Sequence, residues 1–288
     1  GALAAASYGL NPLFALPLYG AGMKVDSVLF YRYFFAIVML GILMKVKKQS
    51  FALKKTDILP LAVMGLLFSF SSLFLFESYN YMDAGIASTI LFVYPVMVAI
   101  IMAIFFHEKV SFITMFSIAL AFTGISLLYE GGDGRTLNLL GVLFVILSSL
   151  TYAIYIVGVN RSSLKNLPTA KLTFYALLFG IIIYVVRLDF CTALQLVPAP
   201  LLWVNVFSLA LFPTIISLIA MTLSIHRIGS TPAAILGALE PVTALFCGVV
   251  VFGEQLTPRI MLGVLMILTA VTLIIAAKPL LELIKKQD

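Results

Sequence analysis

Continuous apolar runs of about twenty residues follow one another along the chain, and each is long enough to cross a bilayer as a helix. The run from Ile86 to Phe106 contains no charged residue. A membrane-spanning β-strand would instead alternate apolar and polar residues over about ten positions. The runs therefore predict a bundle of membrane-spanning helices.

The composition supports the same class. Of the 288 residues, 62% are hydrophobic and only 10% are charged, whereas a soluble domain carries roughly 25% charged residues. So few charges cannot cover the surface of a water-soluble enzyme, and the chain is too apolar for disorder. Ten spans in this length leave short loops and no room for an extramembrane domain.

The apolar runs predict ten spans, at 1–22, 27–44, 58–80, 84–106, 112–129, 138–160, 170–188, 201–225, 231–252 and 258–277. Asp57, Asp83, Ser111 and Thr257 are expected as helix N-caps. We expect a few further residues before Gly1. The first run has no basic flank and is interpreted as a span rather than a removed signal peptide.

Lys and Arg predict the orientation. With the N-terminus in the cytoplasm, the inner segments hold 13 of them, at positions 45, 47, 48, 54, 55, 109, 161, 165, 171, 227, 278, 285 and 286. The outer segments hold 4, at positions 24, 135, 187 and 259. Positive residues concentrate on the cytoplasmic side, so we expect both termini inside and the protein in the cytoplasmic (inner) membrane.

The net charge of +6 is spread over these short segments, so it indicates membrane orientation and no nucleic-acid partner. The two cysteines, Cys191 and Cys247, match no metal or redox motif. His107 and His226 are far apart in sequence. We therefore expect no metal site and no cofactor.

The two halves of the chain repeat one pattern. A shift of 146 positions places Pro95 on Pro241 and Glu108 on Glu254 without a gap. Each stretch contains a span with an internal proline, a glutamate at the span's exit and a hydroxyl residue before the next span. Five spans per half is an odd number, which inserts the second half upside down, as in many secondary transporters that rock about a midplane site.

The segment from Tyr79 to Thr89, with Tyr94-Pro95 and His107 to Ser111, resembles the first repeat of the EamA family of the drug/metabolite transporter superfamily. Glu240-Pro241 with Gly253 to Thr257 resembles the second repeat, and Phe30 to Phe34 resembles the arginine-bearing second span. The resemblance implies an all-α membrane protein of ten transmembrane helices, arranged as two inverted five-helix repeats (1–130 and 138–278) around a central cavity. It also implies transport of small metabolites, with spans one, three, four, six, eight and nine lining the cavity.

Glu240 is the leading candidate for substrate binding. It lies near the centre of the ninth span, where an ionisable group costs about 2.5–3.5 kcal/mol to insert and usually faces a cavity or a partner. It could bind a substrate ammonium group or carry a proton. The alternative is a structural carboxylate hydrogen-bonded across helices, and its repeat partner, Tyr94, is not an acid.

Arg32 and Glu77 fall at similar depth, within about 8 Å of the outer membrane face at 1.5 Å per residue. We expect them to form a mutual ion pair, because buried charges are usually paired. The alternative is that Arg32 binds a substrate carboxylate.

Further candidates come from polar, aromatic and proline residues within the spans. Asn11 and the tyrosines at positions 8, 94, 152 and 155 could line the cavity, although most aromatics in such a chain simply pack. Pro12, Pro95 and Pro241 are candidates for hinges or interrupted helices near a site, or for simple kinks. Glu108 and Glu254 resemble signature glutamates of the family; we interpret them as structural, near the N-terminus of the following helix.

We expect a secondary transporter that exports small amino-acid-like or amphipathic metabolites across the cytoplasmic membrane by alternating access. The alternative is an intramembrane enzyme acting on a lipid-linked substrate, but no Ser-His-Asp arrangement, metal-spaced cluster or phosphate-binding glycine loop is present. A channel would require a ring of like residues. No ATP-binding segment is present, so transport is passive or coupled to an ion such as a proton. The lipid bilayer is the other expected partner, and a homodimer is left open.

Overall fold

The computed structural model describes residues 1–107, 111–129, 138–228 and 236–284, which fold into helices with no strand among them. Of these helical segments, seven are long and apolar enough to cross a membrane, and two shorter apolar helices accompany them. The elements are α1 (Ala2–Gly9), α2 (Asn11–Gly20), α3 (Val25–Val46), α4 (Lys55–Ser78), α5 (Ala84–Leu91), α6 (Tyr94–Phe106), α7 (Phe112–Tyr129), α8 (Leu139–Arg161), η1 (Ser163–Asn166), α9 (Thr169–Arg187), α10 (Leu202–Ala210), η2 (Leu211–Ile216), α11 (Ser217–Ile228), α13 (Leu239–Phe252) and α14 (Pro258–Ile284).

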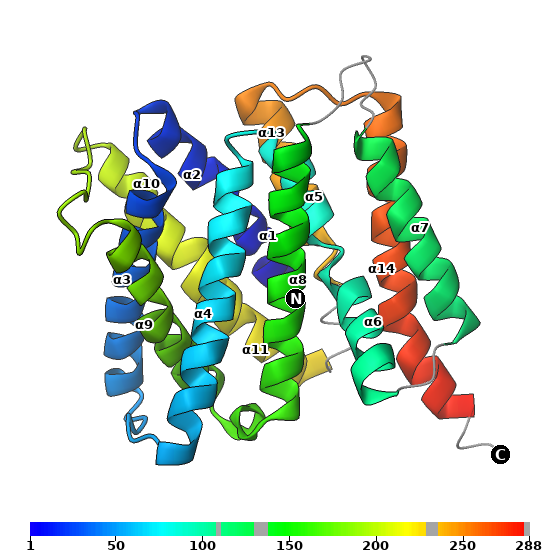
Figure 1. Ribbon diagram of the computed structural model, residues 1–288, viewed down its shortest axis with the longest axis horizontal. Helices are drawn as coiled ribbons and strands as arrows, with labels where there is room; N and C mark the ends of the chain where they lie inside the picture. The colour runs from blue at the N-terminus through cyan, green and yellow to red at the C-terminus, as the bar shows by residue number, and fades with distance from the viewer. Residues whose placement is uncertain (108–110, 130–137, 229–235, 285–288) are drawn as a thin grey trace.

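Corresponding helices of the two halves run in opposite directions (Figure 1). In the view shown, α3 descends and its counterpart α9 ascends, while α4 ascends and the α10–η2–α11 segment descends. The same holds for α7 and α14, which pack side by side at one flank. The inverted arrangement predicted from the odd number of spans per half is confirmed.

Two spans are broken at corresponding places in the repeat. α5 ends at Leu91 and a new helix begins at Tyr94, directly before Pro95. In the second half α13 begins at Leu239, two residues before Pro241. Proline lacks an N–H group and fits only the first turn of a helix without disrupting it. Each span therefore restarts at its proline, which places a helix N-terminus inside the bundle.

The first and eighth predicted spans are also interrupted. The first breaks at Leu10, so that α2 starts with Asn11 and Pro12. In the eighth, η2 is a π-helical segment that contains Pro213, and the Thr214 hydroxyl donates to the Leu209 carbonyl oxygen five residues back (3.5 Å). The sequence predicted one regular span over 201–225; the proline gives the physical reason for the difference. Segments of this kind often occur at functional sites.

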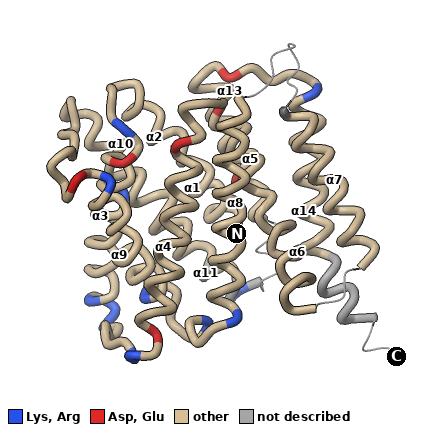
Figure 2. The backbone as a smooth tube through the Cα atoms, viewed as in Figure 1, with Lys and Arg blue, Asp and Glu red and all other residues tan. Residues whose placement is uncertain are grey.

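The ends of the helices differ in charge (Figure 2). Lysines and arginines gather at one end, here called the basic end, where α3 stops and α4 begins and where α8 stops and α9 begins; they are Lys45, Lys47, Lys48, Lys54, Lys55, Arg161, Lys165 and Lys171. The opposite, acidic end carries Asp26, Glu77, Asp83, Asp189 and Glu254 together with Lys24, Arg187 and Arg259. Under the positive-inside rule the basic end faces the cytoplasm.

Glycines allow the closest helix contacts. A Cβ atom added at Gly65 in α4 would lie 2.6 Å from the backbone oxygen of Ala176 in α9, and one added at Gly180 in α9 would lie 2.8 Å from the backbone oxygen of Gly65. Small residues permit such approach between membrane helices. α4 and α9 thus join the two halves at close range.

Two of the four predicted N-caps are confirmed. Ser111 Oγ accepts the N–H of Thr114 (3.1 Å), and Thr257 Oγ1 accepts that of Ile260 (3.3 Å). The prediction for Asp57 is wrong, because α4 begins earlier, at Lys55, and the Asp57 carboxylate accepts the Ser163 hydroxyl (2.7 Å) instead. Asp83 occupies the N-cap position of α5 without making a side-chain cap hydrogen bond there.

Candidate functional site

A cavity of about 560 Å³ lies between the two halves. Residues from eight of the predicted spans line it: the six that the family resemblance implies, together with the second and seventh. They are Ala4, Ala5, Tyr8, Arg32, Phe68, Leu91, Tyr94, Tyr152, Tyr155, Ile156, Asn160, Thr173, Ala176, Pro213, Thr214, Ser217, Leu218, Met221, Gly237 and Glu240. Six of the seven residues predicted to bind substrate are in this set; Asn11 is not.

Glu240 reaches the cavity from the first turn of α13, directly before Pro241. Its backbone N–H donates to the Gly237 oxygen (2.9 Å) across the break in this span. Among the described residues, the Glu240 carboxylate forms no ion pair and accepts no side-chain hydrogen bond. Tyr94, its repeat partner, lines the same cavity from the first residue of α6. The symmetric helix breaks thus place one carboxylate and one phenol at equivalent positions.

Arg32 enters from α3 and is held by neutral groups. Its Nε donates to the Thr214 hydroxyl oxygen (3.2 Å), and its guanidinium carbon lies 5.2 Å from the centre of the Phe76 ring. Tyr8 lies within electrostatic reach of both Arg32 and Glu240. Arg32 is 3% exposed, yet no carboxylate in the described part of the chain pairs with it.

The predicted Arg32–Glu77 ion pair is wrong. The Glu77 carboxylate lies 3.4 Å from Arg187 of α9, and Arg187 also pairs with Asp26 (Nε to Oδ1, 2.5 Å). Similar depth along two helices does not place two side chains on facing sides, and Arg187, counted as a loop residue in the sequence, is the closer cation. The change leaves Arg32 available to a ligand in the cavity.

Aromatic rings form one wall of the cavity. The Tyr94 and Tyr152 rings meet edge to face with centroids 4.8 Å apart, and Tyr152 stacks on Tyr155 at 5.9 Å. Phe68 contacts Tyr155 at 5.3 Å. Such rings offer an apolar surface with polar hydroxyl tips, a suitable lining for an amphipathic molecule.

Asn11 lies beside the cavity rather than in its lining. Its amide donates to the Tyr8 backbone oxygen (2.9 Å), and its side-chain oxygen is buried without a hydrogen-bond partner. The residue stabilises the break between α1 and α2, where a carbonyl freed near Pro12 needs a donor. Its structural contribution is therefore to hold Tyr8 in place.

Contacts between the halves close the acidic end. Besides the Arg187 pairs, Gln195 in the loop before α10 accepts the Lys24 N–H (2.6 Å) and donates to the Gly22 oxygen (3.2 Å). Phe76, Tyr79 and Ser88 lie buried between these contacts and the cavity.

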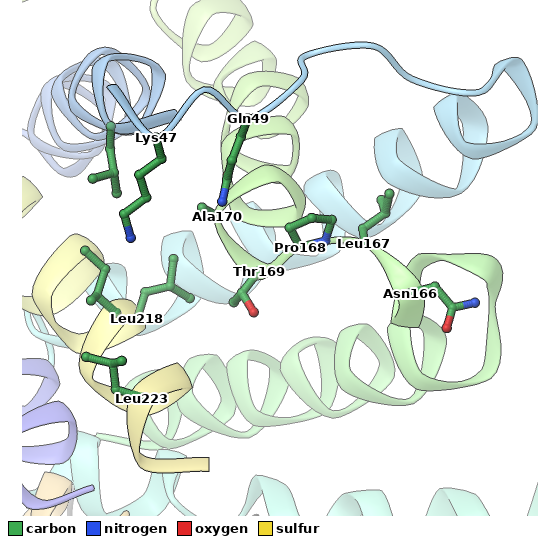
Figure 3. Close-up of a pocket in the computed structure, with 11 residues that line it drawn as sticks. Lys47, Gln49, Asn166, Leu167, Pro168, Thr169, Ala170, Leu218 and Leu223 are labelled. Atoms are coloured by element: carbon green, nitrogen blue, oxygen red, sulfur yellow. The ribbon is translucent and has the colours of Figure 1, made fainter. Parts of the chain in front are cut away.

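Toward the basic end the cavity reaches Asn160, which is exposed, and Thr173. A second pocket of about 500 Å³ lies at this end between α3, α9 and α11, with Lys47, Thr169 and Leu223 in its lining (Figure 3). Leu218 lines both pockets. The central cavity therefore extends to the basic end and is closed at the acidic end.

The remaining predicted residues differ in their placement. Pro12, Pro95 and Pro241 each stand in the first turn of a helix that restarts inside the bundle. Glu108 lies outside the described residues. Glu254 does not act at the following helix, α14, as predicted: its carboxylate accepts N–H groups at the start of α5 in the other half.

Sequence reasoning missed three polar contributors. Thr214 is brought to Arg32 by the π-helical segment, and its only sequence signal is the adjacent Pro213. Gln195 and Arg187 lie at the acidic end in stretches without a motif, so nothing in the sequence distinguishes them from ordinary loop residues.

Comparisons with known proteins point to one family. Residues 1–130 and 139–276 match the sequence model of the EamA-like transporter family. The chain is 25% identical over 222 residues to "Uncharacterized transporter YxxF" of Bacillus subtilis, covering 76% of this chain and 70% of that protein. "Uncharacterized transporter YcbK" of the same organism is 24% identical over 248 residues, covering 83% and 79%. A solved crystal structure superposes with a TM-score of 0.66 over 93% of both chains at 15% identity, which shows the fold.

Proposed function

Because the chain belongs to the EamA-like transporter family, we propose that it is a secondary transporter that exports small amino-acid-like or amphipathic compounds by alternating access. One observation carries the substrate class. Arg32 and Glu240 line a single cavity inside the bundle, and neither has an oppositely charged partner among the described residues. Unpaired charges inside a membrane are costly and mark substrate or ion pathways.

Each charge has a matching substrate group. The Arg32 guanidinium binds a carboxylate, for which its planar fork of donors is suited. The Glu240 carboxylate binds an ammonium group. Tyr8, Tyr94, Tyr152 and Tyr155 contact the apolar part of the substrate. A zwitterion that bridges the two charges neutralises both at once, which an apolar solute does not.

The export direction follows from two features taken together. The cavity extends to the basic end, and the positive-inside rule assigns that end to the cytoplasm of the cell membrane. A substrate therefore loads from the cytoplasm in this conformation and leaves after the acidic end opens. Two halves of like fold and opposite orientation give the two conformations similar energies.

Substitution of Glu240 by Gln tests the proposal, because it removes the charge and keeps the shape. In proteoliposomes loaded with a panel of radiolabelled amino acids, we expect Glu240→Gln to reduce efflux at least tenfold, since the loss of a charge-assisted contact is worth about 1.5–3 kcal/mol. Asp189→Asn, a similar change in the loop after α9, is the matched control and should retain efflux. Equal efflux from Glu240→Gln and the parent at limiting substrate would remove Glu240 from the mechanism.

A further inference from the structure

Glu254 joins the two halves at the acidic end. Its carboxylate accepts the N–H of Ala84 (2.8 Å) and that of Gly85 (3.1 Å), the first two residues of α5. Its own N–H donates to the Gly248 oxygen (2.9 Å), and Gly253 adopts φ +70°, the left-handed conformation that commonly ends a helix. The end of α13 thus directs the Glu254 side chain onto α5.

Two glycines make room for this carboxylate. A Cβ atom added at Gly248 would lie 2.0 Å from Glu254 Oε2, and one added at Gly85 would lie 2.7 Å from the same oxygen. Neither distance is compatible with a real side chain, so both positions exclude any larger residue. The carboxylate therefore occupies a site enclosed by both halves of the molecule.

Opposing effects act on the charge of this group. The two backbone donors favour the ionised carboxylate, whereas burial and the like charge of Asp83 disfavour it. Cys247 is the titratable group that faces it from α13, and Arg259 in the first turn of α14 forms no ion pair with it. Burial and Asp83 prevail and raise the pKa of Glu254 to about 7.

We propose that Glu254 is a proton-binding site of the transport cycle, whose bound proton holds the acidic end closed and whose deprotonation favours opening at that end. The proposal rests on the alternating access proposed above. When the halves separate, Glu254 becomes hydrated and moves away from Asp83, which favours its ionised form. A proton bound in the closed state is thereby released at the acidic end as that end opens.

The sign of the pH dependence follows from linkage. A carboxyl whose pKa is higher in the closed state than in the open state stabilises the closed state at low pH, and this stabilisation is lost as the pH rises through about 7. Glu254 is partly exposed, so solvent screening reduces the effect. One pKa unit of difference corresponds to about a tenfold change in the ratio of open to closed molecules.

A reporter cysteine measures this opening without any substrate. Ser88 lies in α5 between Gly85 and Leu91 and is 5% exposed. In a background with Cys191→Ser and Cys247→Ala, the Ser88→Cys variant in nanodiscs is labelled with a maleimide between pH 5.5 and 8.5. Each rate is divided by that of the same variant unfolded in detergent, which removes the pH dependence of the thiol itself. We expect the corrected rate to rise about tenfold over this range.

Three variants separate a proton site from a structural contact. Glu254→Gln mimics the protonated side chain and should label slowly with no dependence on pH. Glu254→Asp remains titratable and should keep a pH dependence. Asp83→Asn removes the like charge and should move the midpoint to lower pH. The proposal is overturned if Glu254→Gln keeps the parent's profile, or if the parent labels faster at acidic pH. Because no substrate is used, a failed efflux assay would count against the proposed function and leave this result intact.

Discussion

Arg32 shows how a buried cation can be positioned without a countercharge. Thr214 fixes the direction of its Nε–H bond, the Phe76 ring covers its guanidinium, and the remaining donors are available to the cavity. The sequence identified Arg32 and its depth but gave it the wrong partner, because hydropathy fixes how far along a helix a residue lies and not which way it faces. The partner comes from a π-helical segment that no hydrophobic pattern predicts.

A double-mutant cycle on thermal stability in detergent distinguishes these partners. Arg32→Lys and Thr214→Val each remove the 3.2 Å hydrogen bond, so we expect a coupling energy of about 1 kcal/mol between them. Arg32→Ala and Glu77→Gln share no contact and should be additive within about 0.5 kcal/mol. Strong coupling between Arg32 and Glu77 would restore the ion pair that the structure lacks.

The prolines of the repeat illustrate what can be predicted for whole elements. Pro95 and Pro241 gave both the repeat and the places where two spans break, because a helix can restart at a proline but cannot easily continue through it. Gly65 and Gly180 carry no such pattern. Their importance depends on which helix lies opposite, and the sequence does not identify that neighbour.

Gly180→Ala should destabilise the contact between α4 and α9. The added methyl group meets the Gly65 backbone oxygen at 2.8 Å and the Ser69 side chain more closely still. Overpacking of this kind costs about 1–3 kcal/mol, which would lower the melting temperature in detergent. Gly20→Ala is the matched control, because no atom lies within 4 Å of its added methyl group. A Gly180→Ala protein as stable as the Gly20→Ala protein would contradict this close approach.

At the scale of the molecule, the sequence predicted the membrane class, the two inverted halves and six residues of the cavity lining. These features follow from apolar length, an odd number of spans per half and a fixed repeat shift, all of which are one-dimensional. The contacts that close the acidic end were not predictable, because Asp26, Arg187 and Gln195 are far apart in the chain and meet only when the halves dock.

Locking the acidic end closed tests alternating access most directly. Asp26 and Arg187 join the halves there, so cysteines at both positions, in the background without native cysteines, can be bridged by a short thiol-reactive cross-linker. Alternating access predicts that the cross-linked protein still binds a zwitterionic substrate from the basic end but loses efflux from proteoliposomes. A cleavable linker should restore efflux on reduction. Undiminished efflux through the fully cross-linked protein would contradict a cavity that must open at the acidic end.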